Sequence, residues 1–290
     1  MDYLGLIEKR RSIREYRNRA LSEEQKSEIQ RFFDGAEQLV PGMDAQPELL
    51  ICENDARRRL EGVVGYRGNA FDAPAYLVLL SNPADHYLEN AGFMGEALCL
   101  KLTEMGIDHC WLTADDPAMV KKVLMLETEK EVAAVFSCGM GKKERKLRRL
   151  DIFTPSSVRV KEREGHVAPK ISQDEMVYGD KWGKEMDWDP DAIAPALDQA
   201  FYAASLAPSF LNRQPYRFVY RPNMVFLCVK KEEMTSARNL KLDTGAVMLN
   251  FHVLYKDVNP VDDHWYFGLP EGADGVEQPE EFEVVGYYPL

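Results

Sequence analysis

The chain of 290 residues has few cysteines and no long apolar run. Its five cysteines are an odd number without Cys-x-x-Cys spacing, so we expect neither a disulfide framework nor a zinc site. No apolar stretch approaches the roughly 20 residues that a membrane span needs, and the first residues lack the basic and long apolar regions of a signal peptide. Metal-ligand spacing is also missing among the histidines, which we interpret as surface or packing residues: His86, His109, His166, His252 and His264. These absences predict a cytoplasmic protein without a membrane segment or a metal site.

Basic residues are scarce relative to acidic ones. The 36 Lys and Arg stand against 48 Asp and Glu, which gives a formal net charge of −12. A nucleic-acid surface needs a wide basic footprint, so we expect no nucleic-acid partner. The charge is uneven, because residues 257–290 hold nine acids and no Lys or Arg, whereas residues 142–149 hold six bases. This basic run is typical of a solvated helix face, with a small-anion site or a surface for an acidic partner or membrane as alternatives.

Two common catalytic motifs are also absent. Ser209 lacks the Gly-x-Ser-x-Gly context of a hydrolase, and residues 139–142 are too short for a phosphate loop and predict a turn at a strand end. What the chain does contain is 45% apolar and 10% aromatic residues, enough for a folded core. Its length allows one large domain or two ordinary ones.

The patterning of the first half predicts alternating helices and strands. A first helix runs from Asp2 to about residue 11, and a second begins at the capping box of Ser22 with Gln25 and ends near Gly35. A long amphipathic helix then stops at Gly106. The predicted ranges are strands at 48–52, 75–80 and 132–136 and the long helix at 88–105.

A similar order returns after a polar stretch in which Ser172 and Glu175 form a second capping box. The predicted ranges are a helix from about 189 that Pro195 should kink or delay, strands at 217–220 and 225–229, a helix from Asp243 and a last strand at 281–285. Ala36–Pro47 also resembles Ala203–Pro215, and Asn90-Ala91-Gly92 resembles Asp243-Thr244-Gly245. A repeat of this length indicates tandem domains. We therefore predict a first half at 1–153, a connector at 154–189 and a shorter second half at 190–290.

Three segments carry residues suited to ligand binding. The segment Arg10-Arg11-Ser12-Ile13-Arg14 can bind phosphate through guanidinium groups and a hydroxyl, although arginines at a helix end also suit the helix dipole. The segment Pro208-Ser209-Phe210-Leu211-Asn212-Arg213-Gln214-Pro215 is typical of a turn, but it can also offer backbone groups and an amide to a planar polar ring. The third segment is Cys110-Trp111-Leu112-Thr113-Ala114, after the long helix.

Together these segments resemble the nitroreductase superfamily of FMN-dependent enzymes. Members open with Arg-Arg-Ser-x-Arg, continue with Ala-Pro-Ser-x-x-Asn-x-Gln-Pro-Trp, and carry a long helix that leads into a short loop beside the flavin; Tyr216 replaces the family Trp here. The resemblance covers about residues 1–150 and 190–290. It implies an α+β, nitroreductase-like fold, with two repeats in one chain packed as a pseudo-dimer and mostly antiparallel central sheets flanked by helices. Since the family dimer is fused, the resemblance allows a monomer.

The resemblance also implies the cofactor and the residues that bind it. FMN would bind at Arg10, Arg11, Ser12, Arg14, Asn69, Thr113, Ala114, Lys170, Pro208, Ser209, Phe210, Asn212 and Gln214. Arg10 and Ser12 would contact phosphate or ribityl oxygens, Arg14 the N1/O2 edge, and the backbone of Thr113 and Ala114 would face N5. Lys170 is the expected second phosphate ligand, with Lys143 and Arg145 as alternatives.

The motifs are divided between the halves, which predicts one FMN per chain. The arginine element has a good copy only in the first half, and the Pro-Ser-x-x-Asn element only in the second. The resemblance implies that NADH or NADPH reduces the flavin and that a nitroaromatic, quinone or similar acceptor reoxidises it in a ping-pong scheme, without a catalytic side chain. A flavin-storage protein and an interaction module built on the basic run remain alternatives.

Overall fold

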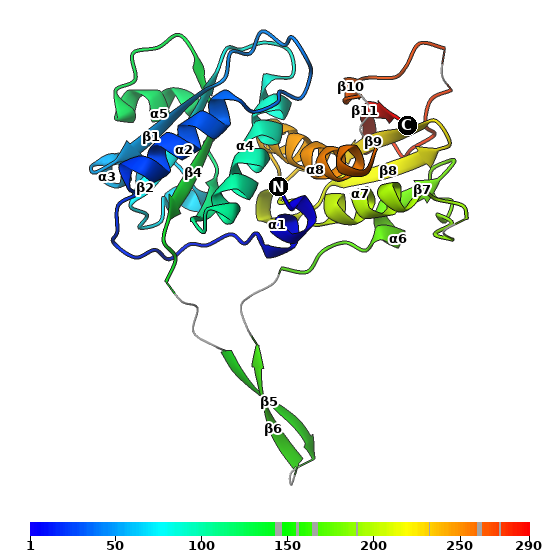
Figure 1. Cartoon of the computed structure of the whole chain (residues 1–290), viewed down its shortest axis with the longest axis horizontal. Helices are drawn as coiled ribbons and strands as arrows, with labels where there is room; N and C mark the ends of the chain where they lie inside the picture. The colour runs from blue at the N-terminus through cyan, green and yellow to red at the C-terminus, as the bar shows by residue number, and fades with distance from the viewer. Residues whose placement is uncertain are drawn as a thin grey trace.

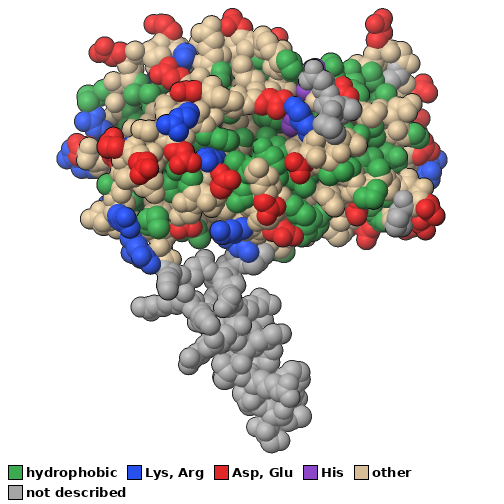
Figure 2. Space-filling model, in the orientation of Figure 1, with side chains coloured by type: hydrophobic (Ala, Val, Ile, Leu, Met, Phe, Trp, Pro, Cys, Tyr) green, Lys and Arg blue, Asp and Glu red, His purple; other side chains and the backbone are tan. Residues whose placement is uncertain are grey.

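The computed structural model describes residues 1–142, 168–189, 191–231, 233–259, 263–272 and 274–290, and the backbone of 147–154 and 157–163. Two sheets, each with a long helix packed against it, lie on either side of the molecule's centre (Figure 1). On the face seen in Figure 2, acidic and basic side chains are interspersed. Within the described ranges, no helix combines the length and the apolar character that a membrane crossing requires.

The first half is built around a four-stranded antiparallel sheet. Its strands are β1 (Glu48–Glu53), β2 (Ala75–Ser81), β3 (Asp108–Leu112) and β4 (Glu131–Gly139), in the order β1-β2-β4-β3. Its helices are α1 (Tyr3–Lys9), α2 (Glu23–Asp34), α3 (Ala56–Leu60), α4 (Tyr87–Glu104) and α5 (Pro117–Leu124), with a 3-10 turn η1 (Tyr66–Gly68). Strand β2 is buried on both faces, because Leu77 belongs to the core shared with α4 whereas Val78 belongs to the core under α3 and α5.

The second half is built around a five-stranded sheet. Its strands are β7 (Val177–Gly179), β8 (Tyr216–Arg221), β9 (Met224–Lys230), β10 (Tyr266–Phe267) and β11 (Phe282–Pro289), in the order β10-β11-β9-β8-β7. Only β7 pairs in parallel, so the sheet is mostly antiparallel. Its helices are α6 (Gln173–Met176), α7 (Pro195–Ser205) and α8 (Ala237–Val258), with a 3-10 turn η2 (Phe210–Asn212). A separate hairpin joins β5 (Leu147–Thr154) to β6 (Ser157–Arg163).

The two halves repeat one topology. The strand order β1-β2-β4-β3 matches β8-β9-β11-β10, and in each half the long helix follows the second of these strands along the chain. The long helices α4 and α8 pack against each other at the centre (Figure 1). A Cβ on Gly92 would overlap the carbonyl of Leu242, and a Cβ on Gly245 would overlap the carbonyl of Glu89. This reciprocal contact is the pattern of a two-fold interface, so the predicted α+β pseudo-dimer is confirmed.

Side-chain caps account for several helix ends that the sequence predicts. Ser22 and Gln25 form the expected capping box, and α2 ends at Gly35. Ser172 and Glu175 form the second box, at α6. Pro195 is the first residue of α7, so this helix is delayed rather than kinked. These ends agree because the hydrogen bonds that define them are local in sequence.

Two local predictions are wrong, and one strand is not predicted at all. Helix α8 begins at Ala237 rather than Asp243, because Ser236 caps it through the Asn239 amide and its first turn is polar. No strand is predicted at residues 108–112, yet the edge strand β3 forms there and pairs with β4. Residues 147–149 of the basic run lie in β5 and not on a helix, whereas residues 143–146 lie outside the described residues.

Candidate functional site

A cavity of about 690 Å³ lies where the two halves meet. Its walls come from the end of α1 and the residues after it, β3, the loop after α7, the first turns of α8 and the segment before α6. The expected residues that line it are Arg10, Arg11, Ser12, Arg14, Thr113, Lys170, Pro208, Ser209, Phe210 and Asn212. Motifs almost 200 residues apart in sequence therefore share one cavity.

The arginine element runs directly beside β3. The Ile13 amide donates to the His109 carbonyl at 2.9 Å, and Ser12 forms a parallel bridge with His109. Arg10 ends α1, and its Nε lies 3.2 Å from Oε1 of Glu96 on α4. The Arg10 side chain is only 9% exposed, and its Nη1 has no hydrogen-bond partner among the described residues. A buried guanidinium N–H without a partner is costly, so this atom is suited to an anionic ligand.

The loop after α7 is held in a strained conformation. Leu211, Asn212 and Gln214 have φ values of 48°, 56° and 51°, a region that residues other than glycine seldom adopt. Both carboxylate oxygens of Asp243 accept from the Phe210 amide, at 3.0 and 2.9 Å. Strain of this kind persists only where surrounding contacts hold it and is concentrated at ligand sites.

Lys170 is fixed against the same loop. Its Nζ donates to the Ala207 carbonyl at 2.6 Å, while the Asn212 amide donates to the Pro169 carbonyl at 2.7 Å. Burial and then Arg10 lower the pKa of Lys170 to about 8, with Glu96 and Asp243 opposing them. Because Lys170 is poorly solvated and is repelled by Arg10, an anion that enters the cavity would stabilise its charged form.

Two buried groups behind the cavity have strongly shifted pKa values. Burial raises the pKa of Glu96 to about 7, against the influence of Arg10, the Trp111 indole and Lys170. Burial and then Arg10 lower the pKa of His109 to about 3, so its imidazole is neutral near pH 7. The positive charge at the cavity therefore comes from the arginines and Lys170, and not from His109.

Aromatic and apolar side chains form the outer walls. Tyr66 and Phe71 come from the segment around η1, Tyr202 from α7 and Leu211 from η2. Tyr66 is 51% exposed and Leu211 is 46% exposed. Tyr202 donates to a Glu8 carboxylate oxygen at 3.0 Å, which links α7 to α1 at the cavity. A flat, partly apolar ring would be covered on such walls.

Three of the expected residues do not line the cavity. The Asn69 carboxamide accepts from the Phe71 amide at 3.0 Å, Ala114 is buried in the core under α3 and α5, and Gln214 bonds Ile171 and Pro169. Gln214 thereby joins the strained loop to the segment that carries Lys170. The alternatives Lys143 and Arg145 lie outside the described residues.

Several residues at the site escape sequence reasoning. Glu8, Tyr66, Phe71 and Tyr202 belong to no motif, and only the fold brings them to the cavity. Glu96 does leave a signal, since it is the only acid in the apolar stretch from Ala91 to Leu100. A single carboxylate in such a stretch must find a partner when the helix is buried.

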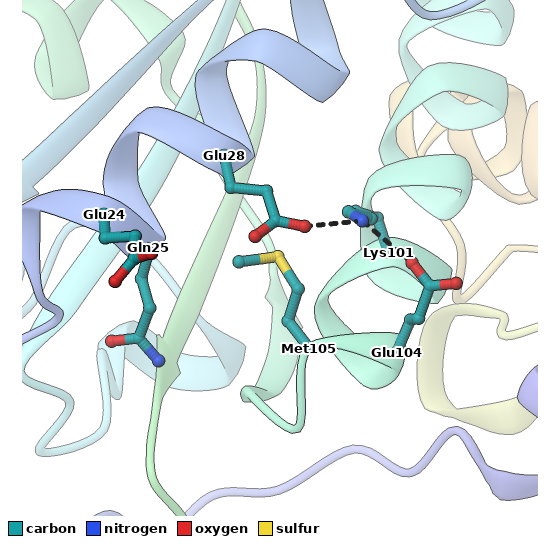
Figure 3. A pocket seen from close by; sticks show the side chains of 6 residues that line it. All are labelled: Glu24, Gln25, Glu28, Lys101, Glu104 and Met105. Carbon is teal, nitrogen blue, oxygen red and sulfur yellow. Dashed lines mark hydrogen bonds and ion pairs between the residues drawn. The ribbon is translucent and has the colours of Figure 1, made fainter.

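A second, smaller hollow of about 380 Å³ lies between α2 and α4 (Figure 3). It is lined by Glu24, Gln25, Glu28, Lys101, Glu104 and Met105. Lys101 pairs with Glu28 and with Glu104, each at 2.8 Å (Figure 3). These partly exposed ion pairs give the Lys101 ammonium group its partners, so this hollow resembles an ordinary charged surface rather than a ligand site.

Comparison with known proteins finds related folds. A putative nitroreductase from Thermotoga maritima covers 100% of this chain with 93% of its own, at a TM-score of 0.57 and 17% identity, which shows a shared fold. An FMN-dependent nitroreductase from Clostridium difficile R20291 aligns over 49% of this chain and 89% of its own, at 20% identity and a TM-score of 0.43. A nitroreductase family protein from Clostridium difficile 630 aligns over 50% and 87%, at 19% identity and a TM-score of 0.43. No curated protein matches the chain.

The family model described as "Putative TM nitroreductase" matches residues 2–254, which is most of the chain. The fold, with its two repeats in one chain, aligns along the whole chain with the Thermotoga maritima structure. The protein is therefore a member of this nitroreductase family.

Proposed function

We propose that the protein is an FMN-dependent oxidoreductase with one FMN in the cavity between its halves. The observation that carries this proposal is the convergence of the Arg10–Arg14 segment and the Pro208–Asn212 loop on one cavity. Its volume of about 690 Å³ falls within the roughly 300 to 1,000 Å³ typical of cofactor sites.

The residues present fit a flavin with a phosphate group. Arg10 has a buried N–H without a partner among the described residues, and Lys170 is a second, partly buried cation at the same wall. We propose that these two groups and Ser12 hold the phosphate and ribityl oxygens, and that Arg14 lies beside the pyrimidine edge of the ring. Positive charge at that edge favours a reduced, anionic flavin. The walls of β3 and the strained loop would cover the ring.

FMN bound there would supply hydride uptake and release. We propose NADH or NADPH as the donor and a nitroaromatic, quinone or similar small molecule as the acceptor, which react in turn in a ping-pong scheme. The protein chain would bind and orient the reactants without a catalytic side chain. We further propose that it works in the cytoplasm and needs no second chain, because the family dimer is fused.

Reduction by a nicotinamide cofactor tests this function. Purified protein is reconstituted with FMN, freed of excess flavin and mixed with NADH or NADPH in the absence of oxygen. We expect the flavin absorbance band to bleach and to return when a quinone is added. A protein that retains FMN but is bleached by neither donor would instead be a flavin-storage protein.

A further inference from the structure

The side chain of Glu96 is fully buried directly behind the cavity. It projects from α4, whose neighbouring residues are apolar, and none of its surface is exposed. Burying a carboxyl group is costly unless other groups stabilise its charge or its hydrogen bonds. The buried position of Glu96 therefore implies that neighbouring groups stabilise its carboxyl group.

Two groups from different elements meet the carboxyl of Glu96. Oε1 lies 3.2 Å from Nε of Arg10, and Oε2 accepts from Nε1 of Trp111 at 3.3 Å. The indole can lie across α4 because Gly95 has no side chain: a Cβ there would be 2.6 Å from Cη2 of Trp111. The carboxyl is thus anchored by Trp111 on one oxygen and directed at Arg10 with the other.

This arrangement leaves the other end of the Arg10 guanidinium available to a ligand. Glu96 forms an ion pair with Nε that lacks hydrogen-bond geometry, whereas Nη1 is buried without a hydrogen-bond partner among the described residues. Arg10 and Lys170 also repel each other, and the Glu96 charge opposes that repulsion. Glu96 is therefore placed to hold Arg10 at the cavity wall.

We propose that Glu96 is a positioning residue that orients the Arg10 guanidinium toward the phosphate of the bound flavin. This inference rests on the proposed function, because it assumes that the flavin phosphate lies at Arg10. Glu96 acts through Arg10 and does not touch the ligand. A flavin without a phosphate should then be almost indifferent to Glu96.

The test compares FMN with riboflavin, which lacks the phosphate. Dissociation constants for both are measured by flavin fluorescence quenching in the wild type, Glu96→Leu and Glu96→Gln. The charge-assisted hydrogen bond from Arg10 to the phosphate should contribute a factor of about 10 to 100 in affinity. We therefore expect Glu96→Leu, which releases Arg10, to raise the dissociation constant of FMN by at least about tenfold and that of riboflavin by less than about threefold. Glu96→Gln keeps an oxygen acceptor and should restore FMN binding to within about fivefold of the wild type.

A matched control lies on the same helix. Glu104→Gln removes a carboxylate that pairs with Lys101 in the outer hollow (Figure 3), far from the cavity lining, and should leave both constants unchanged. A double-mutant cycle completes the test. In an Arg10→Ala background, Glu96→Leu should no longer affect FMN, because the residue through which it acts is gone.

The outcomes separate this inference from the proposed function. Equal weakening of FMN and riboflavin, no weakening at all, or additive effects in the cycle would overturn the positioning role. A wild-type protein that binds neither flavin would instead overturn the proposed function. If Glu96→Leu does not fold, Glu96→Met, which keeps a side chain of similar length and removes the carboxyl group, goes through the same cycle with the same expectation.

Discussion

Among single residues, Arg10 combines the features expected of a phosphate ligand. It lines the cavity, is nine-tenths buried and has an unpartnered Nη1 among the described residues. Losing a charge-assisted hydrogen bond should weaken FMN by about 10- to 100-fold in Arg10→Ala. Fluorescence titration measures this, with Arg17→Ala as the control because Arg17 is exposed and outside the cavity lining. Unchanged affinity in Arg10→Ala would remove Arg10 from the site.

His109 makes the fold sensitive to acid. Its pKa is about 3 in the fold and 6.5 as a reference, so the unfolded chain binds a proton first as the pH falls. Neutral His109 contributes fully to the free energy of unfolding above pH 6.5, and this contribution is lost as the pH falls toward 3. At about pH 4.5 the loss should be roughly 2 to 3 kcal/mol. Urea unfolding of the wild type and His109→Gln at several pH values measures it. We expect their unfolding free energies to converge as the pH falls from about 8, whereas parallel curves would contradict the prediction.

Among elements, the crossing of α4 and α8 depends on two glycines. A Cβ on Gly245 would overlap the Glu89 carbonyl and lie 2.6 Å from the Phe93 amide nitrogen. Backbone atoms cannot move aside as a side chain can, so Gly245→Ala should cost roughly 1 to 3 kcal/mol or more and should also weaken FMN. Urea unfolding and FMN titration measure the two effects. Gly35→Ala is the control, because its Cβ would be 3.6 Å from its nearest contact, the Arg31 carbonyl.

Some elements can be predicted from local sequence patterns, whereas others cannot. The capping boxes at Ser22 and Ser172 and the buried strand β2 follow from neighbours in the sequence. The edge strands β3 and β10 could not be found in this way, because their ladders form only against β4 and β11. The start of α8 was missed because its first turn, before Leu242, is largely polar.

For the whole molecule, the cavity has a counterpart related by the internal repeat. Asn90 corresponds to Asp243, and just as Asp243 accepts from the Phe210 amide, Asn90 accepts from the Leu39 amide at 2.8 Å. Near this counterpart, His86 stacks on Phe267 of β10 with ring centroids 3.5 Å apart and planes 3° apart. At the cavity itself, the equivalent positions are in β3 and the first turns of α8, and they border open space. The repeat is thus preserved in the backbone and altered in its side chains.

This asymmetry predicts one FMN for each chain. Among the described residues, stacked rings lie near the counterpart, and the second half of the sequence has no Arg-Arg-Ser element, so we expect the counterpart to bind no flavin. The ratio of flavin absorbance to protein concentration, measured after reconstitution and gel filtration, should be close to one. A ratio near two would show that both sites bind flavin and that the division of motifs has no functional meaning.

Local patterns in the sequence predict most helix and strand ranges and indicate the two repeats, because periodicity and caps depend on neighbouring residues. The segments that meet at the site follow from the resemblance to the family. The tertiary structure brings Arg10 and Asn212, which the resemblance assigns to one FMN site, to the lining of one cavity. It also brought Glu96 to Arg10 and Tyr202 to Glu8, and it moved Gln214 from the expected ligand shell to a bond with Ile171. These contacts depend on the close approach of α4 and α8, which two glycines permit and which sequence spacing alone does not reveal.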